Sequence, residues 1–252
     1  MNSKNISRIS TRGFYDLSNG KKIKNKSYFI YPKKTFQILS GKKEFVIMIH
    51  GLRNDREGAL QKFIIAKKRL KQLGYINPVI GYTYDSNTKG AHLKKSALKA
   101  LRIGQKIAKS NGYNLSQFII DYKKKNPKMK IRLIGHSLGT EVILSTIKKL
   151  SKNPKNKQII ESVYFFGSSL PNDILGMKKY GKFIQKIVRN KVKNYYSPID
   201  EVLKESYKYG LVKNPLGLFG ISGNTSSKII QIKVYPQNHR FASYAVTLKS
   251  FP

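Results

Sequence analysis

The stretch IRLIGHSLGTEVILSTIKKL, residues 131–150, decides the fold. It begins with a short, largely apolar run typical of a buried strand, and a helical pattern starts directly after GHSLG at 135–139. A Gly-x-Ser-x-Gly sequence between a strand and a helix predicts a sharp, strained turn, with glycines where neighbouring elements come close. We therefore expect Ser137 to project from the edge of a sheet as a nucleophile, with an ordinary tight turn as the alternative.

The flanking sequence repeats this alternation of strand and helix. Buried-type strands are predicted at 44–51, 77–86, 130–137, 161–169, 190–198 and 227–237, with two shorter runs within 27–39. Helices are predicted at 56–74, 92–125 with an interruption near 111–112, 138–151, 173–190 and 238–250, and a long loop at 209–227. The predicted fold class is therefore α/β, with a mostly parallel sheet covered by helices on both faces.

The composition is strongly basic for a chain of 252 residues, a length that suits one α/β domain. Fifty Lys and Arg against 12 Asp and Glu give a formal net charge of +38, which would attract nucleic acid, anionic lipid or acidic polymers. The lysines are spread along the chain, so biased composition is the competing explanation. We divide the chain into a loose basic N-terminal arm at 1–27, with room for a short strand, and a single domain at 28–252.

Several classes of protein are excluded or disfavoured. The chain has no cysteine, which excludes disulfides and thiolate or Cys-metal sites. It shows no secretion signal and no apolar run near the ~20 residues of a membrane span, so a cytoplasmic protein is expected. No specific nucleic-acid motif is present, because the RNA-recognition, KH, zinc-finger and P-loop patterns are all missing.

A serine nucleophile needs a general base, and the chain has four histidines, His50, His92, His136 and His239. Only His239 follows the last predicted strand. Loops from separated strands meet at one edge of such a sheet, so we expect His239 to be the base. His136 lies beside Ser137 with its side chain directed away from the nucleophile, and we expect it to line the substrate site together with Gly51.

The histidine in turn needs an orienting carboxylate. Asp200, with Glu201 next to it, follows the strand predicted at 190–198, and Asp173 follows the strand predicted at 161–169. Either acid satisfies the chain order serine, acid, histidine. We favour Asp200, with a helix N-cap as its structural alternative. The backbone N–H groups of Leu52 and Leu138 are expected to form an oxyanion hole.

Five segments together resemble the lipase-like branch of the α/β-hydrolase superfamily over residues 44–244. They are HGLRNDREGAL at 50–60, VIGYTYDS at 79–86, GHSLGTEVIL at 135–144, NYYSPIDEVL at 194–203 and NHRFASY at 238–244. More narrowly, they are similar to archaeal and bacterial lipase-like hydrolases of undefined substrate. The resemblance implies a sheet of about eight strands, a Ser137–Asp200–His239 triad, and neither a metal nor an organic cofactor.

The sequence thus predicts a serine hydrolase that cleaves a carboxylic ester through an acyl-enzyme, without separating esterase, lipase and thioesterase. Residues 167–190 occupy a lid position and mix apolar residues with lysines, which suggests a lipid ester and peripheral contact with an anionic membrane or polyanion. Ordinary packing on the sheet is the alternative for this segment. The competing function is an inactive hydrolase fold that binds nucleic acid or anionic surfaces through its charge.

Overall fold

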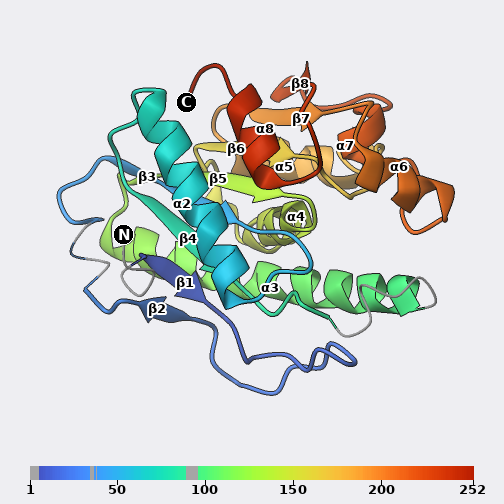
Figure 1. Cartoon of the computed structure of the whole chain (residues 1–252). Helices are drawn as coiled ribbons and strands as arrows, with labels where there is room; N and C mark the ends of the chain where they lie inside the picture. Colours follow the sequence, from blue (N-terminus) through green and yellow to red (C-terminus); the bar gives the residue numbers. More distant parts are fainter. Residues whose placement is uncertain (1–5, 35–36, 38, 89–95) are drawn as a thin grey trace.

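The computed structural model describes residues 6–34, 37, 39–88 and 96–252, and its centre is an eight-stranded sheet (Figure 1). The strand order is β2-β1-β4-β3-β5-β6-β7-β8, and every neighbouring pair is parallel except β1 with β2. The strands are β1 (Arg8–Ser10), β2 (Phe29–Tyr31), β3 (Glu44–Ile49), β4 (Val79–Thr83), β5 (Lys130–His136), β6 (Ser162–Phe166), β7 (Val192–Tyr196) and β8 (Ile229–Lys233). The prediction of a mostly parallel sheet of about eight strands is confirmed.

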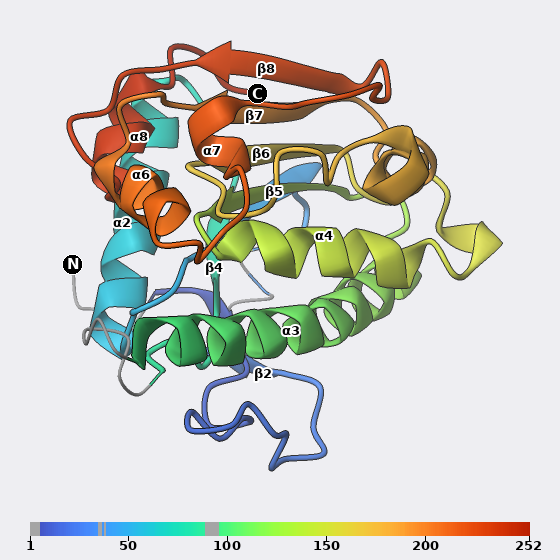
Figure 2. The ribbon, with the colours of Figure 1, turned by 90° about the vertical axis from the view of Figure 1, so that its right-hand side faces the viewer.

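Helices cover both faces of this sheet (Figure 2). One face carries α2 (Arg56–Gln72) and α8 (Phe241–Thr247), and the other carries α3 (Ala97–Lys125), α4 (Gly139–Leu150) and α5 (Lys182–Ile187). The remaining described helices are η3 (Pro154–Asn156), η4 (Met177–Gly181), α6 (Glu201–Lys208) and α7 (Leu216–Phe219). None of the helices in the described ranges is both long enough and apolar enough to cross a membrane.

Strand β3 shows why the core has two halves. Its side chains point alternately to the two faces, so Phe45 and Ile47 join the cluster under α3 and α4, while Val46 and Met48 join the cluster under α2 and α8. All four side chains are fully buried. A strand covered on both faces needs apolar residues at every position, which explains its continuous apolar run.

Where the structure describes it, the N-terminal segment is part of the fold and not a loose arm. Strand β1 pairs with β4, and Phe14 is fully buried. The carboxylate of Asp85 accepts hydrogen bonds from the backbone N–H groups of Gly13, Phe14 and Tyr15, each at 2.9 Å. The prediction left room for a short strand here, and β1, at three residues, is too short to show a hydrophobic period.

Helix α3 runs without interruption through residues 111–112, contrary to prediction. Asn111 is fully buried there, and its side-chain oxygen accepts hydrogen bonds from Thr11 (2.6 Å) and Tyr82 (2.7 Å). A Cβ on Gly112 would lie 2.3 Å from Ser145 Cβ, so this glycine lets α3 and α4 approach closely. The Asn-Gly pair that resembles a helix break is a packing contact.

The segment 209–227, predicted as a long loop, contains helix α7. Leu216 is fully buried, and its N–H donates to the carbonyl of Leu170 at 2.7 Å. The neighbouring Gly217 packs so closely that an added Cβ would lie 2.3 Å from the backbone nitrogen of Ser168. This segment is therefore a packed part of the fold beside the carboxyl edge of the sheet, and the four residues of α7 are too few to give a periodic signal.

Candidate active site

Three side chains that are far apart in the sequence meet at the carboxyl edge of the sheet. The two atoms His239 Nε2 and Ser137 Oγ lie 3.0 Å apart, and His239 Nδ1 lies 2.7 Å from Asp200 Oδ2. The serine directly follows β5, the acid follows β7 and the histidine follows β8. Because a carboxylate only accepts hydrogen bonds, the proton of a neutral His239 is on Nδ1, and Nε2 is left to accept from the serine hydroxyl.

The turn at Ser137 has the strained geometry expected from the sequence. Ser137 has a φ of +52°, in the left-handed region that few residues other than glycine adopt. Its N–H donates to the carbonyl of Phe166 at 2.9 Å, and its carbonyl accepts from the hydroxyl of Thr140 at 2.7 Å. These bonds to β6 and α4 hold a conformation that costs on the order of 1–3 kcal/mol.

The glycines around Ser137 are required by close approaches. A Cβ on Gly139 would lie 2.5 Å from the carbonyl oxygen of Ile49, so only glycine allows α4 to begin against β3. A Cβ on Gly51 would lie 2.9 Å from Ser137 Cβ and 3.4 Å from its Oγ. Gly51 therefore keeps space open beside the hydroxyl.

Asp200 is almost completely buried and binds three donors. Besides His239, Oδ2 accepts from the hydroxyl of Tyr244 at 2.6 Å, and Oδ1 accepts from the N–H of Leu203 at 3.1 Å. Burial alone would raise the pKa of Asp200, but the hydrogen bonds and the charge of His239 outweigh burial and lower this pKa below its ordinary value. The carboxylate is therefore ionised at neutral pH.

The alternative acids do not reach the histidine. Asp173 forms an exposed ion pair with Lys179 at 2.6 Å, and Glu201 forms one with Lys204 at 2.7 Å. Asp200 is thus the acid that the structure brings to His239. Of the histidines, His92 lies outside the described residues.

His136 positions His239 through the backbone. His136 Nε2 lies 2.8 Å from the carbonyl oxygen of His239, so Nε2 carries the proton that is donated. The two imidazole rings lie 5.0 Å apart, between ring centroids. Burial lowers the pKa of His136 well below its ordinary value, with a smaller contribution from His239, so the ring is neutral. His136 also lines the cleft described below.

The loop after β3 carries the N–H of Leu52, and the turn after β5 carries the N–H of Leu138. His50 Nδ1 donates to the carbonyl of Gly51 at 2.9 Å, and Asn54 Nδ2 donates to the carbonyls of Gly51 and Leu52 at 3.0 and 2.7 Å. Within the part of the chain that the structure describes, no acceptor is assigned to the N–H of Leu52 or of Leu138. Both residues line the same cleft as Ser137, as an oxyanion hole requires.

Arg12 supports this loop from the N-terminal segment, a contact that sequence reasoning missed. Its Nη2 donates to the carbonyls of Asn54 and Asp55 at 3.0 and 2.6 Å, and its Nε donates to Thr83 Oγ1 at 2.6 Å. Thr83 also lies 3.2 Å from His50 Nε2.

Tyr244, like Arg12, was missed by sequence reasoning, although it lies in the segment NHRFASY. No periodic or motif signal marks either residue, because each acts through hydrogen bonds to distant parts of the chain.

A cleft of about 560 Å³ opens beside Ser137 and His239. Apart from those two residues and His136, it is lined by Gly51, Leu52, Arg53, Asn54, Lys62, Leu101, Leu138, Ser169, Val202, Leu203, Ser206, Val212, Asn238 and Arg240. Only Ser169 comes from the predicted lid at 167–190, whose Leu175, Ile184 and Ile187 are fully buried in the core. The structure favours ordinary packing for that segment and places α6 at the cleft instead.

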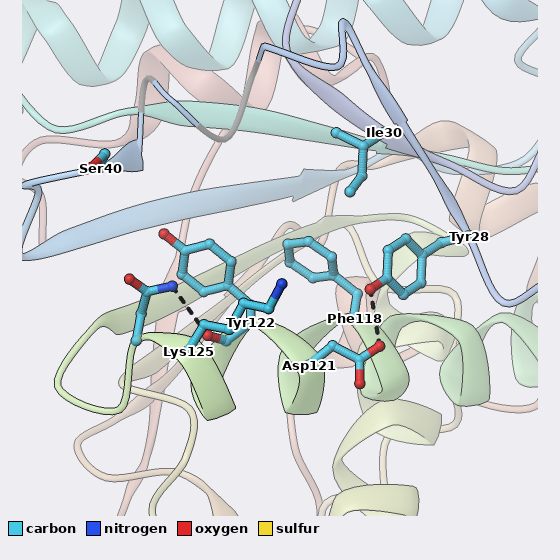
Figure 3. A pocket seen from close by; sticks show the side chains of 8 residues that line it. Tyr28, Ile30, Ser40, Phe118, Asp121, Tyr122 and Lys125 are labelled. Carbon is cyan, nitrogen blue, oxygen red and sulfur yellow. Dashed lines mark hydrogen bonds between the residues drawn. The ribbon is translucent and has the colours of Figure 1, made fainter.

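A second pocket, of about 320 Å³, lies against the C-terminal half of α3, away from this cleft (Figure 3). Its carboxylate, Asp121, accepts hydrogen bonds from Tyr28 at 2.9 Å and from Gln117 at 2.7 Å. The pocket holds no serine–histidine pair. Across the described residues, no cluster of three or more His, Asp or Glu side chains could hold a metal ion.

The strand order, the elbow after β5, and the acid and histidine after β7 and β8 define an α/β-hydrolase fold. The chain belongs to the family described as protein of unknown function (DUF726), whose model matches residues 97–234, more than half of the chain. The matched residues include Ser137 and Asp200 and end before His239.

Solved structures with similar architecture are remote in sequence. TT1662 from Thermus thermophilus is 11% identical, with a TM-score of 0.49 over 82% of this chain and 85% of that one. A cutinase-like protein from Cryptococcus sp. is 11% identical, with a TM-score of 0.43 over 81% and 89%. A lipase-esterase related protein from Clostridium acetobutylicum is also 11% identical, with a TM-score of 0.39 over 82% and 93%. No curated protein matches the chain. These likenesses are too distant to inform activity, which is argued below from the site.

Proposed function

We propose that the protein is a serine hydrolase that cleaves carboxylic esters through an acyl-enzyme. The observation that supports this most directly is the hydrogen-bonded series Ser137–His239–Asp200, with distances of 3.0 and 2.7 Å, at the edge of an open cleft. A nucleophile, a base that accepts its proton and a group that orients the base are the three parts that acyl transfer needs. The unused N–H groups of Leu52 and Leu138 supply the fourth part, an oxyanion hole.

In the first half of the reaction, Ser137 Oγ forms a bond to the ester carbonyl carbon as His239 Nε2 takes the hydroxyl proton. The electron pair moves to the carbonyl oxygen, which accepts hydrogen bonds from the two backbone N–H groups, each worth about 3 kcal/mol. His239 then gives its proton to the alcohol oxygen as the bond between that oxygen and the acyl carbon breaks. Asp200 stabilises the imidazolium throughout and keeps the ring in place.

In the second half, a water molecule attacks the acyl-enzyme while His239 takes one of its protons. The same proton returns to Ser137 Oγ as the acyl group leaves as a carboxylic acid. Neither step requires a redox change. The arrangement is common to esters and thioesters, so the geometry around Ser137 does not distinguish esterase, lipase and thioesterase activity.

The test is covalent labelling with a fluorophosphonate probe, which reacts with activated serines. Wild-type protein should be labelled, with the label at Ser137, and Ser137→Ala should remove the signal while the melting temperature stays similar. Ser227→Ala, which changes an exposed serine at the opposite edge of the sheet, should be labelled like wild type. Labelling of Ser137→Ala at the wild-type level would refute the assignment.

The competing function is a non-catalytic protein that binds nucleic acid or anionic surfaces through its charge of +38. The same protein sample distinguishes it from a hydrolase. Such a protein would bind DNA with a strong dependence on salt and would show no labelling at Ser137. The intact geometry of the triad favours the enzyme, because a scaffold without catalysis has no need for a strained serine aligned with a buried acid.

A further inference from the structure

The charged side chains that line the cleft are all cationic. Among the residues that the structure describes, Arg53, Lys62 and Arg240 line it, and no aspartate or glutamate does. Basic residues make up about one residue in five of the whole chain, so three among 17 lining residues is the number that composition alone would give. The number of cations therefore does not distinguish an anion-binding site from biased composition. An anion-binding site is indicated instead by how deeply the cations are buried, which groups they contact and which elements they come from.

Lys62 is the cation whose position calls for an explanation. It is half-buried in the second turn of α2, and its ammonium group donates only a long hydrogen bond, 3.4 Å, to the carbonyl of Gly58. It forms no ion pair with any carboxylate in the described ranges. Burial lowers the pKa of Lys62, Asp55 opposes this effect, and Arg240 adds to it. A half-buried ammonium group with so little compensation has lost part of its hydration, and an anion in the cleft would offset that cost.

Arg240 extends the positive wall toward the base. It directly follows His239, is exposed, and forms no ion pair with a described carboxylate. Its charge lies close enough to Lys62 to lower the pKa of that ammonium group. Helix α2 and the start of α8 lie side by side, so the two cations reach the cleft from separate elements on one face of the sheet (Figure 1).

The opposite wall of the cleft is apolar. Leu101 lines it from α3, on the other face of the sheet, together with Leu52 and Leu138. Leu52 packs against α3 so closely that a Cβ on Gly104 would lie 2.4 Å from its side chain. Leu52, Leu138 and Leu101 thus lie toward α3, whereas two of the three cations, Lys62 and Arg240, come from α2 and the start of α8; the third, Arg53, follows Leu52 in the loop after β3.

The chemistry of the proposed reaction assigns the two walls to the two parts of an ester. His239 Nε2 must reach the alcohol oxygen to protonate it, so the alcohol part lies on the His239 side of Ser137. Arg240 adjoins His239 in the chain, and Lys62 lies near Arg240. The acyl part then lies toward the leucines, whose surface suits a hydrocarbon chain.

We propose that the cleft takes carboxylic esters whose alcohol part carries an anionic group, a carboxylate or a phosphate, that binds Lys62 and Arg240. This inference rests on the proposed function, since it names the substrate class of the same site. Charge-assisted hydrogen bonds to Lys62, which is half-buried, and to Arg240 are stronger than neutral ones. The preference for an anionic over a neutral ester is therefore large enough to measure.

The test compares the butyrate esters of 3-hydroxyphenylacetate and of 3-hydroxyphenylacetamide, whose phenol leaving groups are similar and which differ by one negative charge. Wild type should have a kcat/KM about ten-fold or more higher for the anionic ester. Lys62→Met keeps the length of the side chain and Arg240→Gln keeps a polar one. Each should reduce the ratio between the two esters, and the double variant should bring it close to one. A third ester, with a phosphate in place of the carboxylate, shows which anion the site prefers.

Two controls separate a local site from the overall positive field of the chain. Lys67→Met removes the same charge from an exposed position of α2, and it should keep the wild-type ratio. A reduction equal to that of Lys62→Met would overturn the proposal, because a long-range field does not depend on which lysine is lost. The phenyl monoester of succinate, compared with that of succinamate, places the charge on the acyl part and should show no gain. An equal gain there would overturn the assignment to the alcohol part.

The outcomes also distinguish this inference from the function on which it depends. If Ser137 is labelled and wild type cleaves both esters at similar rates, the anionic subsite is wrong and the hydrolase stands. If Ser137 is not labelled and neither ester is cleaved, the proposed function fails and the inference fails with it.

Discussion

Asp200 binds His239 with one carboxylate oxygen, and its other carboxylate oxygen caps the N-terminus of helix α6. Oδ2 accepts the Nδ1–H of His239 at 2.7 Å, and Oδ1 accepts the N–H of Leu203 at 3.1 Å. The sequence left two interpretations of Asp200 open, an orienting acid and a helix N-cap, and the geometry contains both. The cap fixes the direction of the carboxylate, so a bond that belongs to the helix also helps to place the imidazole.

Replacement of Asp200 by asparagine should separate these two contacts. The amide oxygen of Asp200→Asn can still cap α6, but the amide NH2 cannot accept the Nδ1–H of His239, so the imidazole loses the partner that keeps Nε2 free to accept. We expect kcat to fall by about 10⁴-fold, the loss typical of a serine triad, with little change in melting temperature. Activity on a chromogenic ester and thermal unfolding measure the two effects.

Asp200→Ala provides the comparison, because it removes the cap as well. It should lose as much activity as the asparagine variant and about 1 kcal/mol more of unfolding free energy. Activity of Asp200→Asn within ten-fold of wild type would show that the carboxylate does not orient the base.

Tyr244 should set the pH range in which Asp200 works. Its hydroxyl donates to Asp200 Oδ2 at 2.6 Å and is one of the hydrogen bonds that lower the pKa of that carboxyl. In Tyr244→Phe this stabilisation of the charged form is lost, so the pKa of Asp200 rises. The fall of kcat/KM toward acid pH should then begin at a higher pH than in wild type, with a loss of only a few-fold at pH 8. Tyr235→Phe, at an exposed position, should leave the profile unchanged. A profile of Tyr244→Phe that overlays the wild type would contradict the role.

The contrast between Ser137 and Arg12 shows what the sequence could and could not predict. The elbow is a local pattern in which five consecutive residues specify the turn, and β3 is a continuous apolar run, so both are visible without any knowledge of contacts. His239 was predicted by elimination, because only four histidines exist and one follows the last strand. The mostly parallel sheet with helices on both faces followed from the alternation of strands and helices along the chain.

The contacts and the helix continuity that the sequence did not predict share a physical cause. Arg12 contacts carbonyls about 42 residues away, and Asp85 binds N–H groups about 70 residues away, through single hydrogen bonds that leave no periodicity in the sequence. The Asn111-Gly112 pair has the composition of a helix break, and only the partners supplied by the packed fold show why the helix continues. Tertiary contacts decided these positions over local preference.

Gly51 should be required for activity more than for folding. An added Cβ would lie 2.9 Å from Ser137 Cβ and 3.0 Å from the carbonyl oxygen of His136, closer than real Cβ atoms tolerate without a shift. In Gly51→Ala the loop that carries the Leu52 N–H must move away from the nucleophile. We expect kcat/KM to fall by about 100-fold or more, the cost of one oxyanion donor, against a destabilisation of about 1–3 kcal/mol. Kinetics at a temperature well below the melting point, with unfolding followed separately, would show whether activity is lost from folded protein. Full activity in the folded variant would contradict the close approach.

Arg12 should act on the reaction through the same loop. Arg12→Gln removes the donors to the carbonyls of Asn54 and Asp55 and loosens the segment that presents the Leu52 N–H. We expect kcat to fall by about ten-fold, with KM changed less, because a displaced N–H weakens binding of the oxyanion more than binding of the ester. The rate of fluorophosphonate labelling should fall in parallel. Lys21→Gln, at an exposed position of the same segment, serves as the control and should match wild type. A normal kcat in a folded Arg12→Gln protein would show that the loop keeps its position without this contact.

The buried histidines should make stability depend on pH. Burial lowers the pKa of His50 and of His136 well below the ordinary value, with smaller contributions from Arg12 and His239 respectively. Below about pH 6.5 the unfolded chain therefore binds protons that the folded chain does not, so the free energy of unfolding falls as the pH is lowered. Each histidine contributes at most about 1.4 kcal/mol per pH unit. Urea unfolding at pH 7.5, 6.5 and 5.5 measures the slope.

A variant isolates the contribution of His136 from those of the other titrating groups. Glu141, whose pKa burial raises, contributes with the opposite sign, since the folded state holds its proton more tightly than the unfolded chain does. His136→Phe keeps a ring beside Phe241 and Tyr244 and removes one titrating group, so it should lower the baseline stability but reduce the slope between pH 6.5 and 5.5. The difference in slope between wild type and variant then reports His136 alone, because Glu141 is common to both. Equal slopes would mean that His136 accepts a proton in the folded state, which its buried Nδ1 without a partner and its donated Nε2–H argue against.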